Sequence, residues 1–280
     1  MRRLAPTIHR THFVGAVAGM ESIMGRAVSP VRDLVDAAFD RFLAPSVEVM
    51  WVLTVVEDIG ARTALRGIFA GVGGSSGSGG AAFGAAADLS RRVNVELVDD
   101  PFEQVVCWLD PREFRSTWLG NKAVYRTRMA IADGGELLVL APGVHRFGED
   151  DRIDRLIRRH GYRTTLTVLD AVAGDPELGR NLGAAAHLIH GSSEGRFRIV
   201  YCTDPARGGL TKADVEAVGY GWRHLNEALA ATGAGAEAAT GWRADSDGQP
   251  YFCVANPALG LWSTAARFSP IPAERPTSTT

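Results

Sequence analysis

The sequence has few lysines, few cysteines and no long apolar run. Cys107, Cys202 and Cys253 are widely separated and form no CxxC pair, which disfavours a zinc site. Each lies in a strand-like apolar run, which predicts buried, reduced thiols in a cytoplasmic protein. No segment reaches the roughly 18 consecutive apolar residues of a membrane span, and the first residues lack the apolar stretch of a signal peptide.

The charge balance and the missing motifs exclude further classes. A formal net charge of −2 gives no basic footprint for nucleic acid or an anionic membrane. The absence of a GxSxG motif argues against an α/β-hydrolase. Residues 71–80 read GVGGSSGSGG, which fits neither GxGxxG nor GxxxxGK[ST]. We interpret this run as a flexible surface loop rather than a phosphate-binding loop.

Helical periodicity and strand-like runs alternate along the chain. Ser29 as N-cap and Pro30 at the first helical position predict a helix start. Helices are expected over residues 30–42, 81–89, 121–132, 150–160, 176–190, 211–218 and 222–231. Strands are expected over residues 48–56, 64–70, 93–97, 104–109, 136–140, 196–202 and 251–254, the first of them buried. This alternation predicts an α/β fold of two α/β subdomains with mixed or largely parallel sheets.

The domain organisation follows from one break in this pattern. Asp99-Asp100-Pro101 interrupts the alternation, so we expect one subdomain over residues 1–98 and another over residues 99–267. Residues 268–280 are rich in Pro, Ser and Thr and are expected to be a disordered tail.

Lys122 is the first candidate for a functional residue. Only two of the 30 Lys and Arg residues are lysines, Lys122 and Lys212. A lysine kept just after Gly120-Asn121 suggests a need for a compact ammonium group, because arginine presents a planar fork instead. Drift within an arginine-rich composition is the alternative.

The histidines offer a second set of candidates. His187 and His190 are three residues apart in a predicted helix and Glu194 follows, a spacing that permits metal ligation. The alternative, which we favour, is that His190 interacts with the carbonyl-rich end of its helix. His12 lies in a polar N-terminal segment typical of exposed histidines.

A family resemblance appears in four segments. RAVSPVRDLVDAA looks like a helix start of the nickel-dependent lactate racemase-like proteins, and residues 50–70 and 81–89 follow in the family's order. LGNKAVYRTRMAIADGGELLVLAPG resembles the family's later stretch, in which a lysine precedes a helix and a Gly-Gly turn. Lys122 falls on that lysine, whereas Leu119 replaces the family's glutamine.

The resemblance implies two α/β domains and a nickel pincer nucleotide that takes a hydride from a 2-hydroxy acid and returns it to either face. It implies that Lys122 binds the substrate carboxylate. It also implies, from the spacing to Ser29-Pro30 alone, that His12 falls near a nickel-ligating position. The family's acid–base histidines and its cofactor-bearing lysine have no counterpart here. Residues 1–98 would then be the rear part of the N-terminal racemase-like domain.

We therefore expect an incomplete or truncated racemase-type isomerase of 2-hydroxy acids, acting alone or with a separate N-terminal half. The alternative is a non-catalytic α/β ligand-binding module or partner subunit. Neither nucleic acid nor a membrane is an expected partner.

Overall fold

Helices and strands alternate in the computed structural model, which describes residues 12–59, 62–72 and 80–268 and confirms the expected α/β fold. The helices are α2 (Pro30–Phe42), α3 (Ala81–Asn94), α4 (Thr117–Gly120), α5 (Lys122–Thr127), α6 (Asp151–His160), α7 (Thr165–Gly174), α8 (Pro176–Gly179), α9 (Leu182–His190), α10 (Lys212–Ala217), α11 (Leu225–Thr232) and α12 (Ala265–Phe268). The strands are β1 (Met50–Asp58), β2 (Thr63–Val72), β3 (Val95–Val98), β4 (Phe102–Trp108), β5 (Ile131–Leu140), β6 (Arg198–Thr203), β7 (Gly221–His224), β8 (Gly241–Ala244), β9 (Pro250–Val254) and β10 (Leu261–Thr264). Short 3-10 turns occur at Met20–Ser22 and Pro205–Arg207.

The central element is a six-stranded sheet in the order β7-β6-β5-β4-β9-β8. All neighbouring pairs are parallel except β8–β9. The chain runs outward from β4 through β5 and β6 to β7, and then returns to place β9 on the other side of β4. The order therefore reverses between β4 and β9, which makes this the topological switch point of the sheet.

Side chains alternate between the two faces of this sheet and form two apolar cores. Val105, Val139 and Tyr201 belong to the larger core, which contains side chains of α5, α6 and α9. Val106, Leu138 and further strand residues of the opposite face pack against α11 in the smaller core. Near-continuous apolar strands predict a sheet of this kind, which is covered on both faces.

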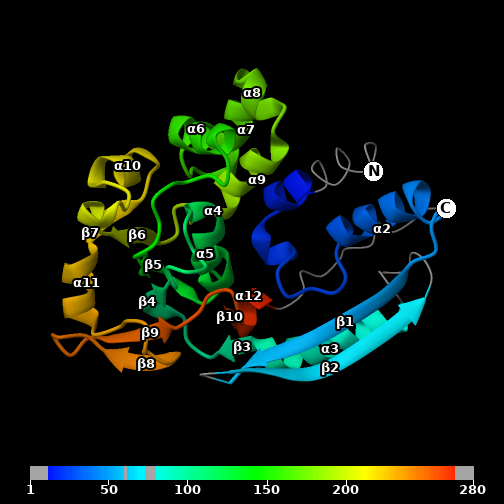
Figure 1. Cartoon of the computed structure of the whole chain (residues 1–280), viewed down its shortest axis with the longest axis horizontal. Helices are drawn as coiled ribbons and strands as arrows, with labels where there is room; N and C mark the ends of the chain where they lie inside the picture. Colours follow the sequence, from blue (N-terminus) through cyan, green and yellow to red (C-terminus); the bar gives the residue numbers. More distant parts are fainter. Residues whose placement is uncertain (1–11, 60–61, 73–79, 269–280) are drawn as a thin grey trace.

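The β1–β2 hairpin forms a separate two-stranded sheet (Figure 1). One face packs against α3, where Gly67 allows the Leu89 side chain to come close. The other face is apolar and open, and Met50, Val52, Ile68 and Val72 on it are 61–67% exposed. The strand expected over residues 48–56 is present, but the prediction that it is buried is wrong, because α3 covers only one of its faces.

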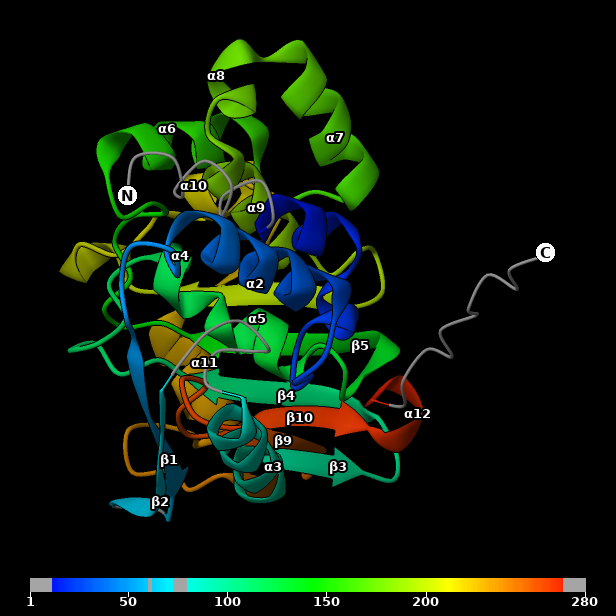
Figure 2. The ribbon, with the colours of Figure 1, turned by 90° about the vertical axis from the view of Figure 1, so that its right-hand side faces the viewer.

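Strand β3 connects the first part of the chain to its end. It pairs in parallel with β10, and Met129 forms an isolated bridge to Ser263 beside it. Both views place α6 to α9 at the opposite end of the molecule from the β1–β2 hairpin (Figures 1 and 2). The division at residues 98 and 99 lies between β3 and β4 and stays a prediction.

Local capping signals produce several of the predicted helix starts. The Ser29 side chain accepts a hydrogen bond from Arg32 N at the start of α2, with Pro30 at the first helical position. Asp150 caps α6 in the same way, and Thr211 and Asp214 form a reciprocal capping box on α10. These side chains satisfy backbone N–H groups that have no partner within the helix.

Four predicted helices differ from the structure, and one of them, expected over residues 81–89, continues to Asn94 as α3. The helix expected over residues 121–132 ends at Thr127, because Ile131 already pairs with Phe102 in the sheet. The helix expected over residues 222–231 begins only at Leu225, since residues 221–224 form β7 against β6. The helix expected over residues 176–190 is broken into α8 and α9, and Asn181 caps the second.

Two further observations concern membrane spans and the residues outside the described structure. Within the part of the chain that the structure describes, no helix combines the length and apolar character needed to cross a membrane. Most of the glycine-rich run, residues 73–79, lies outside the described residues, as does the expected tail from residue 269 onward.

Candidate functional site

The segment that carries Trp118 and Lys122 forms two short helices, α4 and α5, after the carboxyl end of β4. Ser116 caps α4, and its Oγ lies 3.4 Å from Leu119 N. Trp118 N donates to Phe147 O at 2.9 Å, which fixes α4 against the loop that follows β5. The side chains of this segment are thus presented from a backbone held by tertiary hydrogen bonds.

Lys122 opens α5 and is partly exposed. Its Nζ lies 3.8 Å from Glu113 Oε1 and 5.7 Å from the centroid of the Phe114 ring, and 27% of the side chain is accessible. A separation of 3.8 Å is an ion pair but is longer than a hydrogen bond. The ammonium group is therefore positioned by its neighbours and can still donate to a ligand.

His187 of α9 is buried against α4. Its ring lies 4.2 Å from the Trp118 ring, centroid to centroid, at an interplanar angle of 31°. Its Nε2 is 3.1 Å from Tyr162 Oη, which is also 2.6 Å from Thr117 Oγ1. The ring of His187 is thus held between an indole and a phenol hydroxyl.

His190 lies one turn further along α9 and meets His12. The two rings are perpendicular, with centroids 4.8 Å apart. The Tyr125 ring of α5 lies 6.3 Å from His190 on another side. Tyr125 is one turn along α5 from Lys122, so His190 lies beside the short helix that Lys122 begins. We call His12, His187 and His190 the histidine cluster.

Burial keeps the two α9 histidines neutral. It lowers the pKa of His190 to about 3, and positive charge at His12 and Arg128 contributes in the same direction. Burial likewise holds the pKa of His187 well below its usual range, with smaller contributions from His190 and His12. His190 Nε2 is buried and finds no hydrogen-bond partner among the described residues. A neutral imidazole therefore occupies the end of α9.

Glu194 does not join the histidine cluster. Its carboxylate accepts hydrogen bonds from Thr165 N at 3.0 Å and from Thr165 Oγ1 at 2.9 Å, at the start of α7. The backbone of Glu194 has a φ of 54°, an uncommon conformation for a residue other than glycine. The spacing of His187, His190 and Glu194 in the sequence therefore does not produce a three-ligand site.

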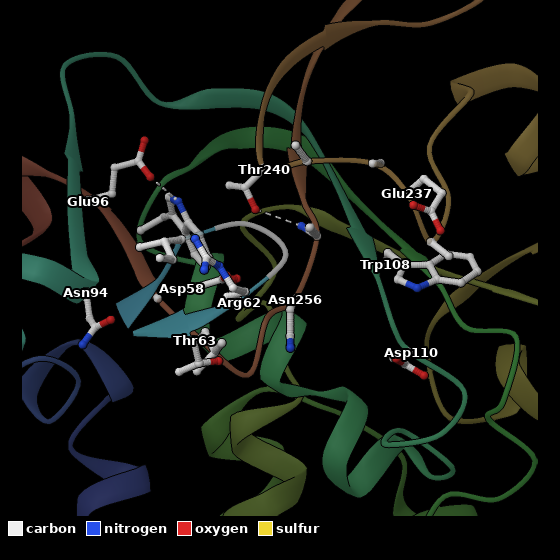
Figure 3. Close-up of a pocket in the computed structure, with 18 of the residues that line it drawn as sticks. Asp58, Arg62, Thr63, Asn94, Glu96, Trp108, Asp110, Glu237, Thr240 and Asn256 are labelled. Atoms are coloured by element: carbon white, nitrogen blue, oxygen red, sulfur yellow. Dashed lines mark hydrogen bonds between the residues drawn. The ribbon is translucent and has the colours of Figure 1, made fainter. Parts of the chain in front are cut away.

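A cleft of about 1130 Å³ lies at the switch point of the sheet (Figure 3). Trp108 and Asp110 line it from the end of β4, and Asn256 lines it from the loop after β9. Its other walls come from the β1–β2 hairpin, the α3–β3 junction and residues 236–240. Lys122 and the histidine cluster do not line this cleft.

Two polar residues in the sequence mark this cleft, although they belong to no motif. Asp110 and Asn256 are polar residues that closely follow two buried strands, and carboxyl ends of parallel strands meet at one edge of a sheet. Only the strand order shows that β4 and β9 are neighbours. No comparable signal in the sequence marks Tyr162, because this residue follows the end of α6 and belongs to no motif.

Comparisons with known proteins bear on the fold. No protein-family model and no curated protein matches the sequence. Among solved structures, the chain is similar to a protein from Thermotoga maritima, with 19% identity and a TM-score of 0.71 over 90% of this chain and 58% of that one. It is also similar to the lactate racemase apoprotein from Thermoanaerobacterium thermosaccharolyticum, with 13% identity and a TM-score of 0.54 over 88% of this chain and 54% of that one.

The chain has a lactate racemase-like fold. At these identities the similarity extends to the fold alone, so the resemblance noted in the sequence is confirmed at that level. The chain spans 58% and 54% of the lengths of the two structures it matches. The roles of Lys122 and His12 stay predictions.

Within the described residues, the donor groups of this chain do not fit a resident metal cofactor by themselves. Among residues 12–59, 62–72 and 80–268, no group of three or more His, Cys, Asp or Glu side chains is placed to hold a metal ion. The second lysine, Lys212, lies on α10 and pairs with Glu216 at 3.8 Å. Ligands for a metal cofactor would therefore come from outside the described residues.

Proposed function

We propose that this chain forms the substrate-carboxylate side of a racemase-type isomerase that acts on 2-hydroxy acids. One observation carries the proposal: within a lactate racemase-like fold, Lys122 and a cluster of histidines gather around α4 and α5. An ammonium group can bind the substrate carboxylate, and neutral imidazoles can accept or donate a hydrogen bond at the hydroxyl group.

Lys122 has the features that such a role requires. Its side chain is partly exposed, it starts a helix, and Glu113 holds it at 3.8 Å. A cation at a helix start is unfavourable for the helix by roughly 0.3–1 kcal/mol, and a bound anion would offset this. The substrate carboxylate would then share the ammonium group with Glu113.

The histidine cluster would lie beside the substrate hydroxyl. His187 is oriented by Tyr162, and His190 has an imidazole nitrogen without a hydrogen-bond partner among the described residues. Both are neutral at pH 7 and can hydrogen-bond the hydroxyl group, and the lowered pKa values make both of them weak bases as they stand.

The proposal assigns the nickel pincer nucleotide to a separate polypeptide that supplies the N-terminal half. The described residues here do not provide its ligand set. The open apolar face of the β1–β2 hairpin, with Met50, Val52, Ile68 and Val72, is a surface that such a half could cover. His12 would contribute to the metal from this chain.

A non-catalytic α/β ligand-binding module is the second candidate. The observation that favours it is the lack of a metal-ligand group among the described residues. Such a module would bind a 2-hydroxy acid without interconverting its enantiomers.

Calorimetric titration with L-lactate and D-lactate, with propionate as the analogue that lacks the hydroxyl group, tests the carboxylate site. Lys122→Ala should weaken lactate binding about ten-fold or more, because a charge-assisted bond contributes roughly 1.5–3 kcal/mol. Lys212→Ala is the matched control, since Lys212 also pairs with a glutamate at 3.8 Å. Equal effects of the two substitutions would contradict the proposal.

The stability of the Lys122→Ala variant separates a ligand-binding role from a structural one. We expect its free energy of unfolding to stay within about 0.5 kcal/mol of the parent, as for an ordinary surface substitution. A large loss of stability with unchanged lactate binding would assign Lys122 to the fold instead.

Chiral chromatography of enantiopure lactate after incubation distinguishes the two candidate functions. The protein should be purified from its own cells, so that a partner polypeptide can accompany it. Interconversion together with nickel in the sample supports the isomerase, whereas binding without interconversion supports the module. An intact mass of this chain that exceeds the sequence mass by a nucleotide would contradict the assignment of the cofactor to a partner.

A further inference from the structure

The switch-point cleft is a preformed cavity that the proposed isomerase chemistry does not use. Ligands of open parallel sheets bind in the crevice outside the carboxyl ends of the strands, where the strand order reverses. The cleft occupies this place between β4 and β9, and its volume of about 1130 Å³ is ample for a small molecule. Its lining therefore indicates which ligand it would take.

The lining carries an excess of negative charge. Four carboxylates and two guanidinium groups face the cleft, namely Asp58, Glu96, Asp110, Glu237, Arg62 and Arg112. Arg112 is committed to Asp110, with Nη2 at 2.6 Å and Nε at 3.0 Å from its carboxylate oxygens. This contact lowers the pKa of Asp110 to about 2. The remaining groups leave the cleft with two negative charges in excess.

The carboxylates lie on both sides of the cleft. Glu237 lies near Trp108 on one side in Figure 3, and Asp58 and Glu96 lie on the other with Asn256 between the two sides. Glu96 is fixed by a 2.7 Å hydrogen bond from Trp262 Nε1. The cleft thus combines two separated acidic ends with an indole wall.

We propose that this cleft binds an organic cation that carries amino groups at both ends of an aliphatic chain. Carboxylates on opposite sides match two separated ammonium groups, and a cleft lined by one sign of charge concentrates the opposite ion. The face of the Trp108 indole attracts a cation or its methylene groups. Anions, including the carboxylate of a 2-hydroxy acid, are repelled, so this site is separate from the one at Lys122.

A series of three four-carbon compounds tests the charge preference. Putrescine, 1,4-butanediol and succinate share a chain length and differ in ending with ammonium, hydroxyl or carboxylate groups. Calorimetry and tryptophan fluorescence at low ionic strength should give binding in the order putrescine, butanediol, succinate. Succinate or butanediol binding as tightly as putrescine, or no binding of putrescine at all, would overturn the proposal.

Two glutamate substitutions locate the binding. Glu237→Gln should weaken putrescine binding about two- to five-fold, the usual contribution of an exposed charge pair. Glu227→Gln, on the exposed surface of α11 and outside the cleft, is the matched control and should leave binding unchanged. Equal effects of the two substitutions, or equal binding of Mg²⁺ and putrescine, would mean a general attraction of cations to an acidic surface and would refute the site.

Discussion

Acidification from pH 7 to pH 5 should destabilise the fold through the two buried histidines of α9. His187 and His190 are only 6% and 7% exposed. Burial lowers both pKa values, that of His190 to about 3. In the unfolded chain a histidine titrates near 6.5. Between these pKa values the unfolded state binds more protons than the folded state, so stability rises with pH and is lost as the pH falls below about 6.5.

The magnitude follows from the width of this window. One histidine that stays neutral in the folded state costs about 2 kcal/mol when the pH falls from 7 to 5. The two histidines together should therefore cost about 4 kcal/mol. Asp110 and Asp175 also have lowered pKa values, but carboxyl groups lose their contribution only at about pH 4 and below, outside this interval.

Urea unfolding followed by circular dichroism at pH 7 and pH 5 measures this difference. His190→Asn removes one titrating group and should reduce the pH-dependent loss from about 4 to about 2 kcal/mol. His145→Asn is the control, because His145 is exposed, and should leave the loss near that of the parent. A parent that loses less than about 1 kcal/mol, or a His190→Asn variant with the full pH dependence, would refute the burial argument.

Three further predictions concern the thiols and two glycines. A thiol reagent should react with no cysteine in the native protein and with all three after denaturation. The reason is that Cys107, Cys202 and Cys253 are buried and their pKa values are raised. A disulfide between any two of them would contradict this prediction. Gly191→Ala should destabilise the fold by about 1–3 kcal/mol in thermal or urea unfolding, because the new Cβ would clash with Asn121 Nδ2 and the Tyr162 ring. The new Cβ of Gly84→Ala in α3 would have no atom within 4 Å, so this substitution should raise the free energy of unfolding by up to about 1 kcal/mol. A loss of stability in this variant would contradict the prediction.

Much of the local structure could be predicted from the sequence, because the signals act within one or two turns. Ser29 before Pro30, Asp150 before an acidic first turn, and Thr211 three residues before Asp214 each mark a helix start that the structure contains. The hydrogen bonds that they form link residues three positions apart. The alternation of these helices with apolar strands was enough for the α/β class.

Helix ends were less predictable where a strand competed for the same residues. Residues 128–132 continue a helical pattern, yet Ile131 forms β5 because it pairs with Phe102 of β4. Trp222 likewise pairs with Tyr201 of β6 rather than joining α11. A parallel ladder with a distant strand decided these positions, and no local pattern contains that partner.

For the candidate sites too, some features could be predicted from the sequence and others only from the tertiary structure. The sequence by itself named Lys122 through the scarcity of lysine and His12 through a resemblance, and it noted the spacing of His187 and His190. Only the tertiary structure placed His187 on Trp118 and His190 on His12, and it directed Glu194 to Thr165 instead. The switch-point cleft also depends on tertiary structure, because strand order brings its walls together from distant segments. Residue types and spacings fix which chemical groups are available, whereas long-range strand pairing and burial decide which of them meet and which stay neutral.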